Sequence, residues 1–424
     1  MGRSKTWYRG QTTVSFRPVH DANEKGVMKK KVAVLGAGSA GLLTAAHLCT
    51  WLDDSWEIIS VYNPKKPILG IGESTNGGVI SVLERATNFS LAYPDDLAAL
   101  DATIKYGSRF ANWRKEGWVN PLLSGNVAIH FNNRRLKDFV FERLTKLWPG
   151  QFSVLEADVR NIQNYADHVT VGTDQGLHDF DFVVDCMGTP GTFDGYTMSD
   201  CTLMDRCLVH TVERYDYEPF TDHIATRDGW MFGVPLKGYK TYGYLYSQAF
   251  TEPRAAEEEM MRLLGADKRE PGTYDAQYEF RCYYANELIS GRVCKNGNRA
   301  LFFEPLLANS MFLYVYASRL IYDYIANAQD AARCNGLFVK AVQEMEDVIS
   351  YYYRGGSTFQ TDVWRASAER AQARLARRPQ LTEYLGRLRE LKRRGLMHAG
   401  PSYAFSPHTW QIVDVAMGYR SFEP

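Results

Sequence analysis

Residues 29–52 read KKKVAVLGAGSAGLLTAAHLCTWL and carry the strongest structural signal in the chain. Three lysines precede the apolar run 32–35, which predicts a buried strand, and a helical pattern begins at residue 42. Between them, Gly36, Gly38 and Gly41 fit the pattern G-x-G-x-x-G. A second strand at 57–62 completes a βαβ unit of the size that binds a dinucleotide.

Each of the three glycines has its own structural role in such a loop. The first permits a tight turn, the second lets a pyrophosphate approach the backbone, and the third lets the helix pack close to the strand. The helix N-terminus adds N–H groups that favour phosphate. We therefore expect cofactor contacts from the whole loop, which comprises Gly36, Ala37, Gly38, Ser39, Ala40 and Gly41. The competing interpretation is a tight turn between strand and helix without any ligand.

The ribose contact of a dinucleotide is not evident in the sequence. The second strand ends Val61-Tyr62-Asn63-Pro64, without the acidic residue that NAD enzymes usually place there. A later apolar strand, 180–185, ends in Asp185 and is followed by Gly188, an arrangement common in two-dinucleotide-type flavoproteins. Asp185 is therefore a further candidate for cofactor binding, although an ordinary strand end gives the same pattern.

Composition excludes several classes of function. Lys plus Arg and Asp plus Glu both number 49 in this chain of 424 residues, so nucleic acid is an unsuitable main partner. The seven cysteines are scattered without a CxxC pair, which favours reduced thiols and a cytoplasmic location. No apolar stretch is long enough to span a bilayer, so we expect no membrane partner. The histidines at 130, 398 and 408 do not form i, i+4 pairs, so we assign no metal.

The element pattern predicts an α/β fold: an FAD-binding Rossmann-like module of the two-dinucleotide type with an interleaved antiparallel substrate sheet and a helical C-terminal part. Expected helices are 79–118 (mainly helical), 134–146, 255–265, 307–330 and most of the last ninety residues, and expected strands are 153–160, 168–172, 180–185, 207–250 and 299–306. We divide the chain into an N-terminal arm (1–28), the FAD-binding module (29–330, with the substrate-side sheet at about 207–290) and a helical part that covers the substrate site (331–424).

Five segments occur in an informative order. They are the glycine loop, Gly70-Ile71-Gly72-Glu73-Ser74-Thr75, the run DATIKYGSRFANWR at 101–114, Trp230-Met231-Phe232-Gly233-Val234-Pro235, and Phe303-Glu304-Pro305-Leu306. The set resembles flavin-dependent halogenases of the tryptophan-halogenase type, whose motifs are G-x-G-E-A-T, K-F-x-N-W-R, W-x-W-x-I-P and F-V-E-P-L. Weaker similarities are Asp362-Val363-Trp364-Arg365 and Phe405-Ser406-Pro407-His408-Thr409-Trp410, so the resemblance spans residues 31–420.

The resemblance implies an activity and its co-substrates. FAD, reduced by a separate flavin reductase to FADH2, would react with O2 and a halide to give hypohalous acid, which a lysine delivers to an electron-rich aromatic small molecule. Lys105 falls on the position of that lysine, and Gly72, Glu73, Ser74 and Thr75 fall on the strap that lies over the flavin. The residues expected on the substrate side are Trp230, Phe232, Pro235, His130 and Trp410.

Residue chemistry agrees with a special role for Lys105. A buried amine loses its charge readily, and a helix over 79–118 would place Arg109 at i+4 on the same face, which lowers the lysine pKa further. The competing interpretation is a solvated surface lysine. Trp230 and Phe232 are two residues apart on an expected strand and so share a face, either to separate flavin from substrate or simply to pack the core.

The chain departs from the family in two ways. Where the family reads E-P-L-E-S-T-G, this sequence has Leu307 in place of the second glutamate and Asn309-Ser310 in place of the Thr-Gly pair that holds chloride. We expect Asn309 and Ser310 to bind the halide, with iodide or bromide preferred over chloride because they shed water and oxidise more easily. The short segment 115–128 and a reduced C-terminal lid predict an open site with relaxed or larger substrates than free tryptophan.

Two other functions fit the same sequence. One is an FAD-dependent monooxygenase that hydroxylates an aromatic substrate, and the other is a catalytically inactive flavin-binding scaffold, which the loss of a carboxylate at Leu307 favours. The natural substrate, the regiochemistry, the group that replaces the missing glutamate and the oligomeric state stay open at this stage.

Overall fold

The computed structural model describes residues 29–68, 73–122, 126–214, 216–265 and 274–421. The predicted N-terminal arm at 1–28 and the predicted strap glycine Gly72 lie outside the described residues.

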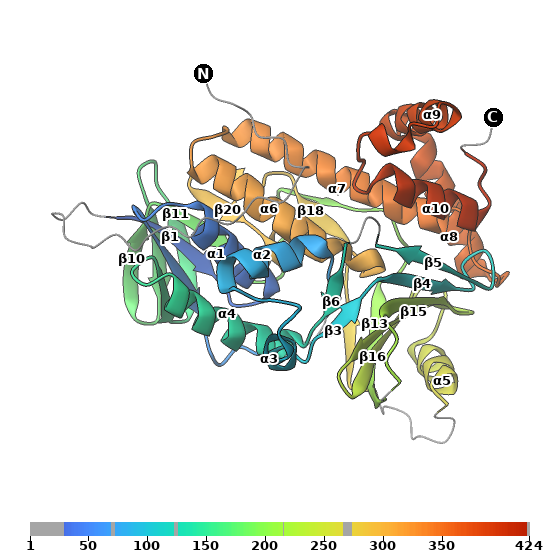
Figure 1. The fold of residues 1–424 in the computed structure, drawn as a ribbon, viewed down its shortest axis with the longest axis horizontal. Helices are drawn as coiled ribbons and strands as arrows, with labels where there is room; N and C mark the ends of the chain where they lie inside the picture. The colour runs from blue at the N-terminus through green and yellow to red at the C-terminus, as the bar shows by residue number, and fades with distance from the viewer. Residues whose placement is uncertain (1–28, 69–72, 123–125, 215, 266–273, 422–424) are drawn as a thin grey trace.

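A six-stranded sheet built around the βαβ unit forms one side of the molecule (Figure 1). Its strands, in spatial order, are β19 (Ile289–Ser290), β20 (Val293–Lys295), β11 (Phe182–Asp185), β1 (Lys30–Leu35), β2 (Trp56–Tyr62) and β7 (Phe152–Glu156). All neighbours pair in parallel except β19 with β20. The apolar runs at 32–35 and 58–61 suit strands that are buried on both faces.

Alternation along β1 supplies both faces of this sheet. Val32 and Val34 belong to the main core with helix α1 (Ser39–Trp51), whereas Ala33 and Leu35 pack in a second core with a three-stranded sheet. That smaller sheet consists of β10 (Gly176–Phe180), β9 (Val169–Thr173) and β8 (Val159–Asn164). Helix α1 is buried on every side, as its uniformly apolar sequence predicts.

A seven-stranded sheet forms the other side of the molecule (Figure 1). Its order is β17 (Ala276–Glu279), β13 (Arg206–Glu213), β16 (Tyr239–Tyr246), β15 (Gly229–Leu236), β14 (Phe220–Ala225), β4 (Gly107–Ala111) and β5 (Gly117–Pro121). Only β14 and β4 pair in parallel. The sheet therefore recruits residues 107–121 in addition to the expected region near 207–290.

Two further small sheets connect the halves. The pair β3 (Thr103–Lys105) and β6 (Ala128–His130) is antiparallel, and so is the set β12 (Tyr196–Met198), β18 (Tyr283–Ala285) and β21 (Leu301–Phe302). The expected strand over 299–306 is thus reduced to Leu301–Phe302, because short 3₁₀ turns at Gly297–Arg299 and Leu306–Ala308 flank it.

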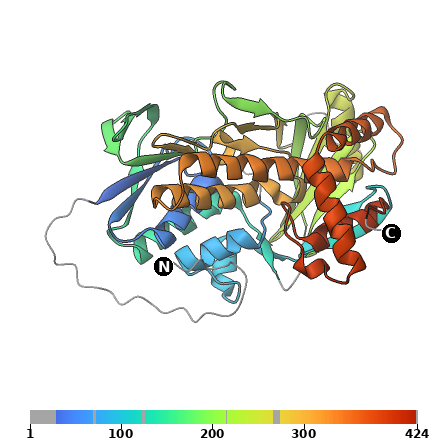
Figure 2. The same ribbon diagram turned by 90° about the horizontal axis from the view of Figure 1, so that it is seen from above.

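Helices pack across and beyond the sheets. They are α2 (Gly77–Thr87), α3 (Pro94–Ala99), α4 (Asn133–Leu147), α5 (Pro253–Leu263), α6 (Asn309–Ile325), α7 (Ala331–Tyr353), α8 (Asp362–Ala376), α9 (Pro379–Arg393) and α10 (Pro407–Met417), with a 3₁₀ turn at Met397–Ala399. Figure 2 shows α6 and α7 running side by side, with α8 to α10 gathered at one end of the molecule. The α/β fold with a helical C-terminal part, predicted from the sequence, is confirmed.

The prediction of a mainly helical segment at 79–118 is wrong for its second half. Helix α2 ends at Thr87 and the short helix α3 ends at Ala99, after which the chain forms strands β3, β4 and β5. Asp101, Asn112 and Arg114 have positive φ angles, which interrupt any helix there.

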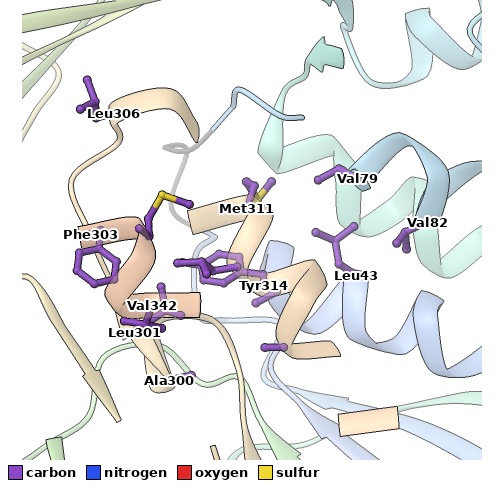
Figure 3. Close-up of a cluster of buried hydrophobic side chains, with 14 of the residues drawn as sticks. Leu43, Val79, Val82, Ala300, Leu301, Phe303, Leu306, Met311, Tyr314 and Val342 are labelled. Atoms are coloured by element: carbon purple, nitrogen blue, oxygen red, sulfur yellow. The ribbon is translucent and has the colours of Figure 1, made fainter. Parts of the chain in front are cut away.

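The main core joins the two halves. Figure 3 shows side chains from α1, α2, α6 and α7 meeting those that surround β21, among them Leu43, Val79, Phe303, Met311 and Val342. This packing fixes the N-terminus of α6 against the rest of the chain. Strand β3, which carries Lys105, and its partner β6 lie between the two large sheets in Figure 1.

Candidate active site

The glycine loop has the geometry that a bound phosphate requires. Gly36 has φ +99°, and a Cβ there would lie 2.9 Å from the carbonyl oxygen of Cys186. A Cβ on Gly41 would lie 1.9 Å from the carbonyl oxygen of Gly36, so these two positions exclude side chains for structural reasons. A Cβ on Gly38 would meet nothing within 4 Å. The space over Gly38 is therefore open in front of the first turn of α1, and these residues fit a dinucleotide phosphate.

The other residues of the loop are placed around that opening. Ala37 and Ala40 are buried, and the Ser39 hydroxyl donates to Asn133 Oδ1 at 2.5 Å. Asp185 lies beside Leu35 at the end of β11. Its carboxylate accepts from the Met187 N–H at 2.9 Å and pairs with Arg299 Nε at 2.9 Å, an ion pair that the sequence pattern did not indicate.

The strap residues Glu73, Ser74 and Thr75 are buried against β6. Thr75 Oγ1 donates to the carbonyl of Ile129 at 2.7 Å, and the Phe131 N–H donates to the carbonyl of Glu73 at 2.9 Å. Burial raises the pKa of Glu73 to about 7. These bonds fix the strap in register with β6 and turn Ser74 toward β3.

Lys105 is an interior amine. Its side chain lies on β3 with 2% of the residue surface exposed, and Nζ donates to Ser74 Oγ at 2.8 Å and to the carbonyl of Thr75 at 3.1 Å. Burial lowers the pKa of Lys105 to about 7, because removal from water disfavours the ammonium form. Near neutral pH this amine is poised between its charged and neutral forms.

The prediction that Arg109 lowers the Lys105 pKa from the next helical turn is wrong. Lys105 and Arg109 lie on separate strands, β3 and β4. Arg109 pairs with Asp222 at 2.7 Å and with Glu218, and these two carboxylates raise its own pKa. The shift of the Lys105 pKa comes from burial and not from a neighbouring arginine.

Four side chains extend from Lys105 through the interior, and we call them the hydroxyl–imidazole series: Ser74, Thr221, His130 and Thr103. Thr221 Oγ1 lies 2.9 Å from Ser74 Oγ and 2.8 Å from His130 Nε2. The other ring nitrogen, His130 Nδ1, lies 3.2 Å from Thr103 Oγ1. The sequence singled out Ser74 and His130 but gave no signal for Thr221 or Thr103, because these contacts join residues far apart in the chain.

Trp230 and Phe232 lie in a buried aromatic stack beside Lys105. His223 is sandwiched between Phe110, at a centroid distance of 4.7 Å, and Trp230, at 5.6 Å. Phe232 contacts Trp230 edge-on at 6.3 Å. Burial, followed by the charge of Lys105, lowers the pKa of His223 to about 3, so this histidine is neutral. Sequence reasoning missed His223.

The start of α6 lies next to the same histidine. Leu307 and Ala308 have φ angles of +64° and +56°, an unfavourable conformation for two successive residues with side chains. The Leu307 N–H donates to His223 Nε2 at 3.2 Å. Asn309 is fully buried, and its side chain donates to the carbonyl of Glu304 at 3.1 Å. The first-turn amides of α6, like those of any helix, have no acceptors inside the helix.

Glu304, the acidic residue of the segment Phe303-Glu304-Pro305-Leu306, is fully buried. Its carboxylate accepts from Thr202 at 2.7 Å and from Tyr353 at 2.9 Å, and burial raises its pKa to about 7. Glu304 thus links its own segment to α7 and to the loop around Thr202 by hydrogen bonds.

The remaining predicted substrate-side residues are divided between two places. The Pro235 carbonyl accepts from Thr103 Oγ1 at 2.6 Å and so adjoins the hydroxyl–imidazole series. Trp410 lies on α10 and packs on the rings of Tyr351, Tyr384 and Tyr403. None of these ring contacts reaches Lys105, and a role of Trp410 toward substrate stays a prediction.

The described part of the chain lacks a metal cluster and a membrane-spanning helix. Among residues 29–421 apart from the gaps noted above, no group of three or more His, Cys, Asp or Glu side chains is placed to hold a metal ion. In the same part of the chain, no helix has the length and apolar character needed to cross a membrane.

Comparison with known proteins gives one family. The family model described as tryptophan halogenase matches residues 31–139 and 124–423. The chain is 24% identical over 436 residues to tryptophan 7-halogenase RebH of Lentzea aerocolonigenes, with 80% of this chain and 79% of that protein covered.

Solved structures of halogenases have a fold similar to that of this chain. A tryptophan C-6 flavin-dependent halogenase (chlorinase) from taromycin biosynthesis superposes with a TM-score of 0.76 at 17% identity, over 92% of this chain and 90% of that one. A tryptophan halogenase from Shewanella frigidimarina gives a TM-score of 0.75 at 19% identity, with the same shares of 92% and 90%.

The glycine loop yields a prediction that separates binding from folding. We expect Gly38→Ala to fold with a free energy of unfolding within about 1 kcal/mol of wild type but to weaken FAD binding at least about tenfold, because its methyl group occupies the open phosphate approach. Gly41→Ala forces a methyl group against backbone and should cost about 3 kcal/mol. Urea unfolding and fluorescence titration with FAD measure both. Gly336→Ala, on the open face of α7, is the control; equal FAD affinity in Gly38→Ala and this control would contradict the assignment.

The buried amine yields a prediction about stability and pH. Below pH 7 Lys105 is charged in both folded and unfolded chains, so the wild type bears the full cost of burying the ammonium. From pH 7 upward the folded state loses the proton first, so wild-type stability rises with pH by up to about 1.4 kcal/mol per unit until the unfolded pKa of about 10.4.

We therefore expect the stability of Lys105→Met relative to wild type to fall by about 2–3 kcal/mol between pH 6.5 and 9.5. Urea unfolding at the two pH values measures the difference. Lys340→Met, an exposed lysine on α7, should show no such change. A Lys105→Met difference that is independent of pH would mean that Lys105 is not a neutralised interior amine.

Proposed function

The chain belongs to the tryptophan halogenase family of flavin-dependent enzymes, and we propose that it halogenates electron-rich aromatic substrates by way of Lys105. The observation that carries the proposal is the isolated interior amine, which is held by the strap and has a pKa of about 7. An amine of this kind is neutral often enough at physiological pH to accept a halogen atom from hypohalous acid.

The residues that would hold the cofactor are the glycine loop, Asp185 and the strap residues from Glu73 to Thr75. When bound as FADH2, the flavin would supply two of the four electrons that reduce O2, and the halide would supply the other two as it is oxidised to hypohalous acid. A separate flavin reductase would supply FADH2. The open approach at Gly38 supports this assignment, since the other two glycines exclude side chains for reasons of fold alone.

Lys105 has the position to receive the halogen. The strap fixes its nitrogen at one point through Ser74 Oγ and the Thr75 carbonyl. Lys105 is itself buried, and so are Trp230 and Phe232. An electrophilic halogen held on this amine is kept from bulk water, which limits its hydrolysis.

We propose that the halide binds at Asn309 and Ser310 and that iodide or bromide is preferred over chloride. The amides of the first turn of α6 are the available donors, but the Leu307 amide is already engaged by His223. Such a site has fewer donors with which to replace the strong hydration of chloride. Iodide and bromide lose their water at lower cost and oxidise more readily.

We propose an open substrate site with a relaxed range of aromatic substrates, which the helical part 331–424 partly covers. The segment between Arg114 and Ala128 contains only the short strand β5 as a regular element in its described part, which supports a site with little enclosure. The boundaries of the three domains (1–28, 29–330 and 331–424) are still a prediction from the sequence. All seven cysteines are buried and unpaired, which supports a cytoplasmic location.

The central test is Lys105→Met in the FAD-loaded enzyme with a flavin reductase, O2, bromide and a panel of phenols and indoles. We expect brominated product to fall at least about a hundredfold, while FAD affinity stays within about threefold of wild type, since the lysine does not hold the flavin. Mass spectrometry of the products and FAD fluorescence measure the two effects. Lys340→Met is the matched control. Full bromination by Lys105→Met would exclude the proposed chemistry, and hydroxylated products formed without any halide by wild type would identify a monooxygenase.

Halide preference is tested by competition. With equal concentrations of chloride, bromide and iodide, we expect brominated and iodinated products to exceed chlorinated product by about tenfold or more, a difference of about 1.4 kcal/mol in activation free energy. Product ratios from mass spectrometry decide the matter. Equal or greater chlorination would show that the substituted α6 terminus handles chloride well.

A further inference from the structure

The hydroxyl–imidazole series ends at the surface. Thr103 lines a pocket of about 310 Å³, together with Arg214, Asp216, Tyr217, Lys237 and Tyr239, among others. Four of these residues, Arg214, Asp216, Tyr217 and Lys237, are exposed, so the pocket is open to water. The series therefore leads from the interior amine of Lys105, through a continuous line of hydrogen bonds, to a side chain that lines this pocket.

The direction of every hydrogen bond in this line can be deduced. Thr103 donates its only hydroxyl proton to the Pro235 carbonyl at 2.6 Å, so it must accept from His130 Nδ1–H. Burial, followed by the charges of Lys105 and Lys240, lowers the pKa of His130, so the ring is neutral and Nε2 is a bare acceptor. Thr221 therefore donates to Nε2.

The same reasoning continues to the lysine. Since the Thr221 hydroxyl proton is used at His130, Thr221 accepts from Ser74, and Ser74 accepts from Lys105 Nζ at 2.8 Å. All bonds from Lys105 to Thr103 thus point away from the amine. The line ends on the Pro235 carbonyl, which cannot pass a proton on, so a proton reaches water when the Thr103 hydroxyl turns from Pro235 to the pocket. Such a polarised line is the arrangement that lets a proton leave by one concerted shift along it.

We propose that the hydroxyl–imidazole series is a proton relay that carries protons between Lys105 and the water of this pocket. Its role in catalysis rests on the proposed halogenase function. Within it, His130 and Thr221 are positioning and proton-transfer residues that act on Lys105 and do not touch the halogen.

The relay closes a balanced cycle. The ammonium of Lys105 loses one proton outward, and the neutral amine attacks hypohalous acid, so that an N–X bond forms, the O–X bond breaks and water leaves. After the outward shift every hydroxyl of the series points toward Lys105, and His130 carries its proton on Nε2 instead of Nδ1. In this arrangement the series can return one proton from the pocket to the haloamine nitrogen. The protonated haloamine then gives X⁺ to the aromatic ring, the N–X bond breaks as C–X forms, and the ring proton passes to the amine. The sum is ArH plus HOX giving ArX plus H2O.

Two features explain why this chain would need such a route. Position 307 holds leucine, so no carboxylate is available there. Glu304 bonds to Thr202 and Tyr353 through one of its oxygens, and the hydrogen bonds of Lys105 go to a hydroxyl and a carbonyl instead. An interior amine cannot exchange protons with water at a useful rate unless polar groups connect the two. The hydroxyl–imidazole series provides that connection.

The charged and titratable groups around the series are otherwise fixed. His223 on β14 is neutral within its aromatic stack. Lys240 on β16 pairs with Asp222, which also binds Arg109 on β4. Glu73, next to Ser74, has a pKa of about 7 and so titrates in the same range as Lys105, and Glu73→Gln is included below to separate its effect.

The first test is independent of turnover. In full-length protein labelled with ¹⁵N at histidine, with the signal of His130 identified by its loss in His130→Gln, we expect a neutral ring with Nδ1 protonated from pH 5.5 to 8. In Thr221→Val the bare Nε2 should shift toward the value of a nitrogen without a hydrogen bond. An imidazolium at pH 6, or protonation at Nε2, would overturn the relay as drawn.

The second test measures the relay in the FAD-loaded enzyme. We expect Thr221→Val, which keeps the shape but removes the hydroxyl, to lower kcat for bromination at least about tenfold at pH 6.5, with KM for the aromatic substrate within about twofold. The deficit should shrink above pH 8, where the amine rests in its neutral form, and the solvent isotope effect on kcat should fall toward one. Thr221→Ser should restore the rate to within about threefold.

Controls separate the relay from general damage. Thr226→Val removes a buried hydroxyl that donates to the Tyr244 hydroxyl, and it should leave kcat, its pH profile and its isotope effect unchanged. Glu73→Gln should keep the isotope effect if the protons travel through His130. A Thr221→Val enzyme with the wild-type rate and isotope effect at pH 6.5 would refute the relay. If wild type makes no halogenated product, the proposed function fails, and the ¹⁵N measurement alone then decides whether the line of hydrogen bonds exists.

Discussion

The burial of one amine constrains the rest of this structure. Lys105 has almost no contact with water, and its nitrogen bonds to a hydroxyl and a carbonyl instead of a carboxylate, so its ammonium form is destabilised where it lies. Three elements from distant parts of the chain compensate by surrounding it with hydroxyl, carbonyl and imidazole groups: the strap, β6 and β14. The stability that is lost there must come from the apolar packing that joins the two large sheets, which is why the site and the core cannot be varied independently.

Local sequence signals predicted what depends on local geometry. The glycines at 36, 38 and 41 specify a turn whose constraints are all within a few residues, and the apolar runs at 32–35 and 182–185 form neighbouring strands as expected. The spacing of Trp230 and Phe232 gave their shared face, because alternation is a property of a single strand. The motif order indicated the family, and the family model agrees with it.

Contacts between distant segments could not be predicted in this way. The segment 101–111 has helix-compatible residues, yet pairing with β6 and β14 makes it two strands. Arg109, expected beside Lys105 on a helix, forms an ion pair with Asp222 instead. The sequence around Thr221 and His223 predicts a strand and gives no sign of a functional role. Only the folded structure brings these two residues near Lys105. No pattern within one element reveals such a cluster, since each member is defined by a partner elsewhere.

The parallel pairing of β4 with β14 also affects how the chain folds. Arg109 and Asp222, which meet across these strands, are 113 positions apart. During synthesis from the N-terminus, β4 leaves the ribosome long before its neighbour exists, and at ordinary elongation rates it waits roughly ten seconds. For that interval an apolar hairpin with Phe110 and Trp113 has an unpaired edge, so folding should be slow and chaperone holding should raise the yield of soluble enzyme in a heterologous host.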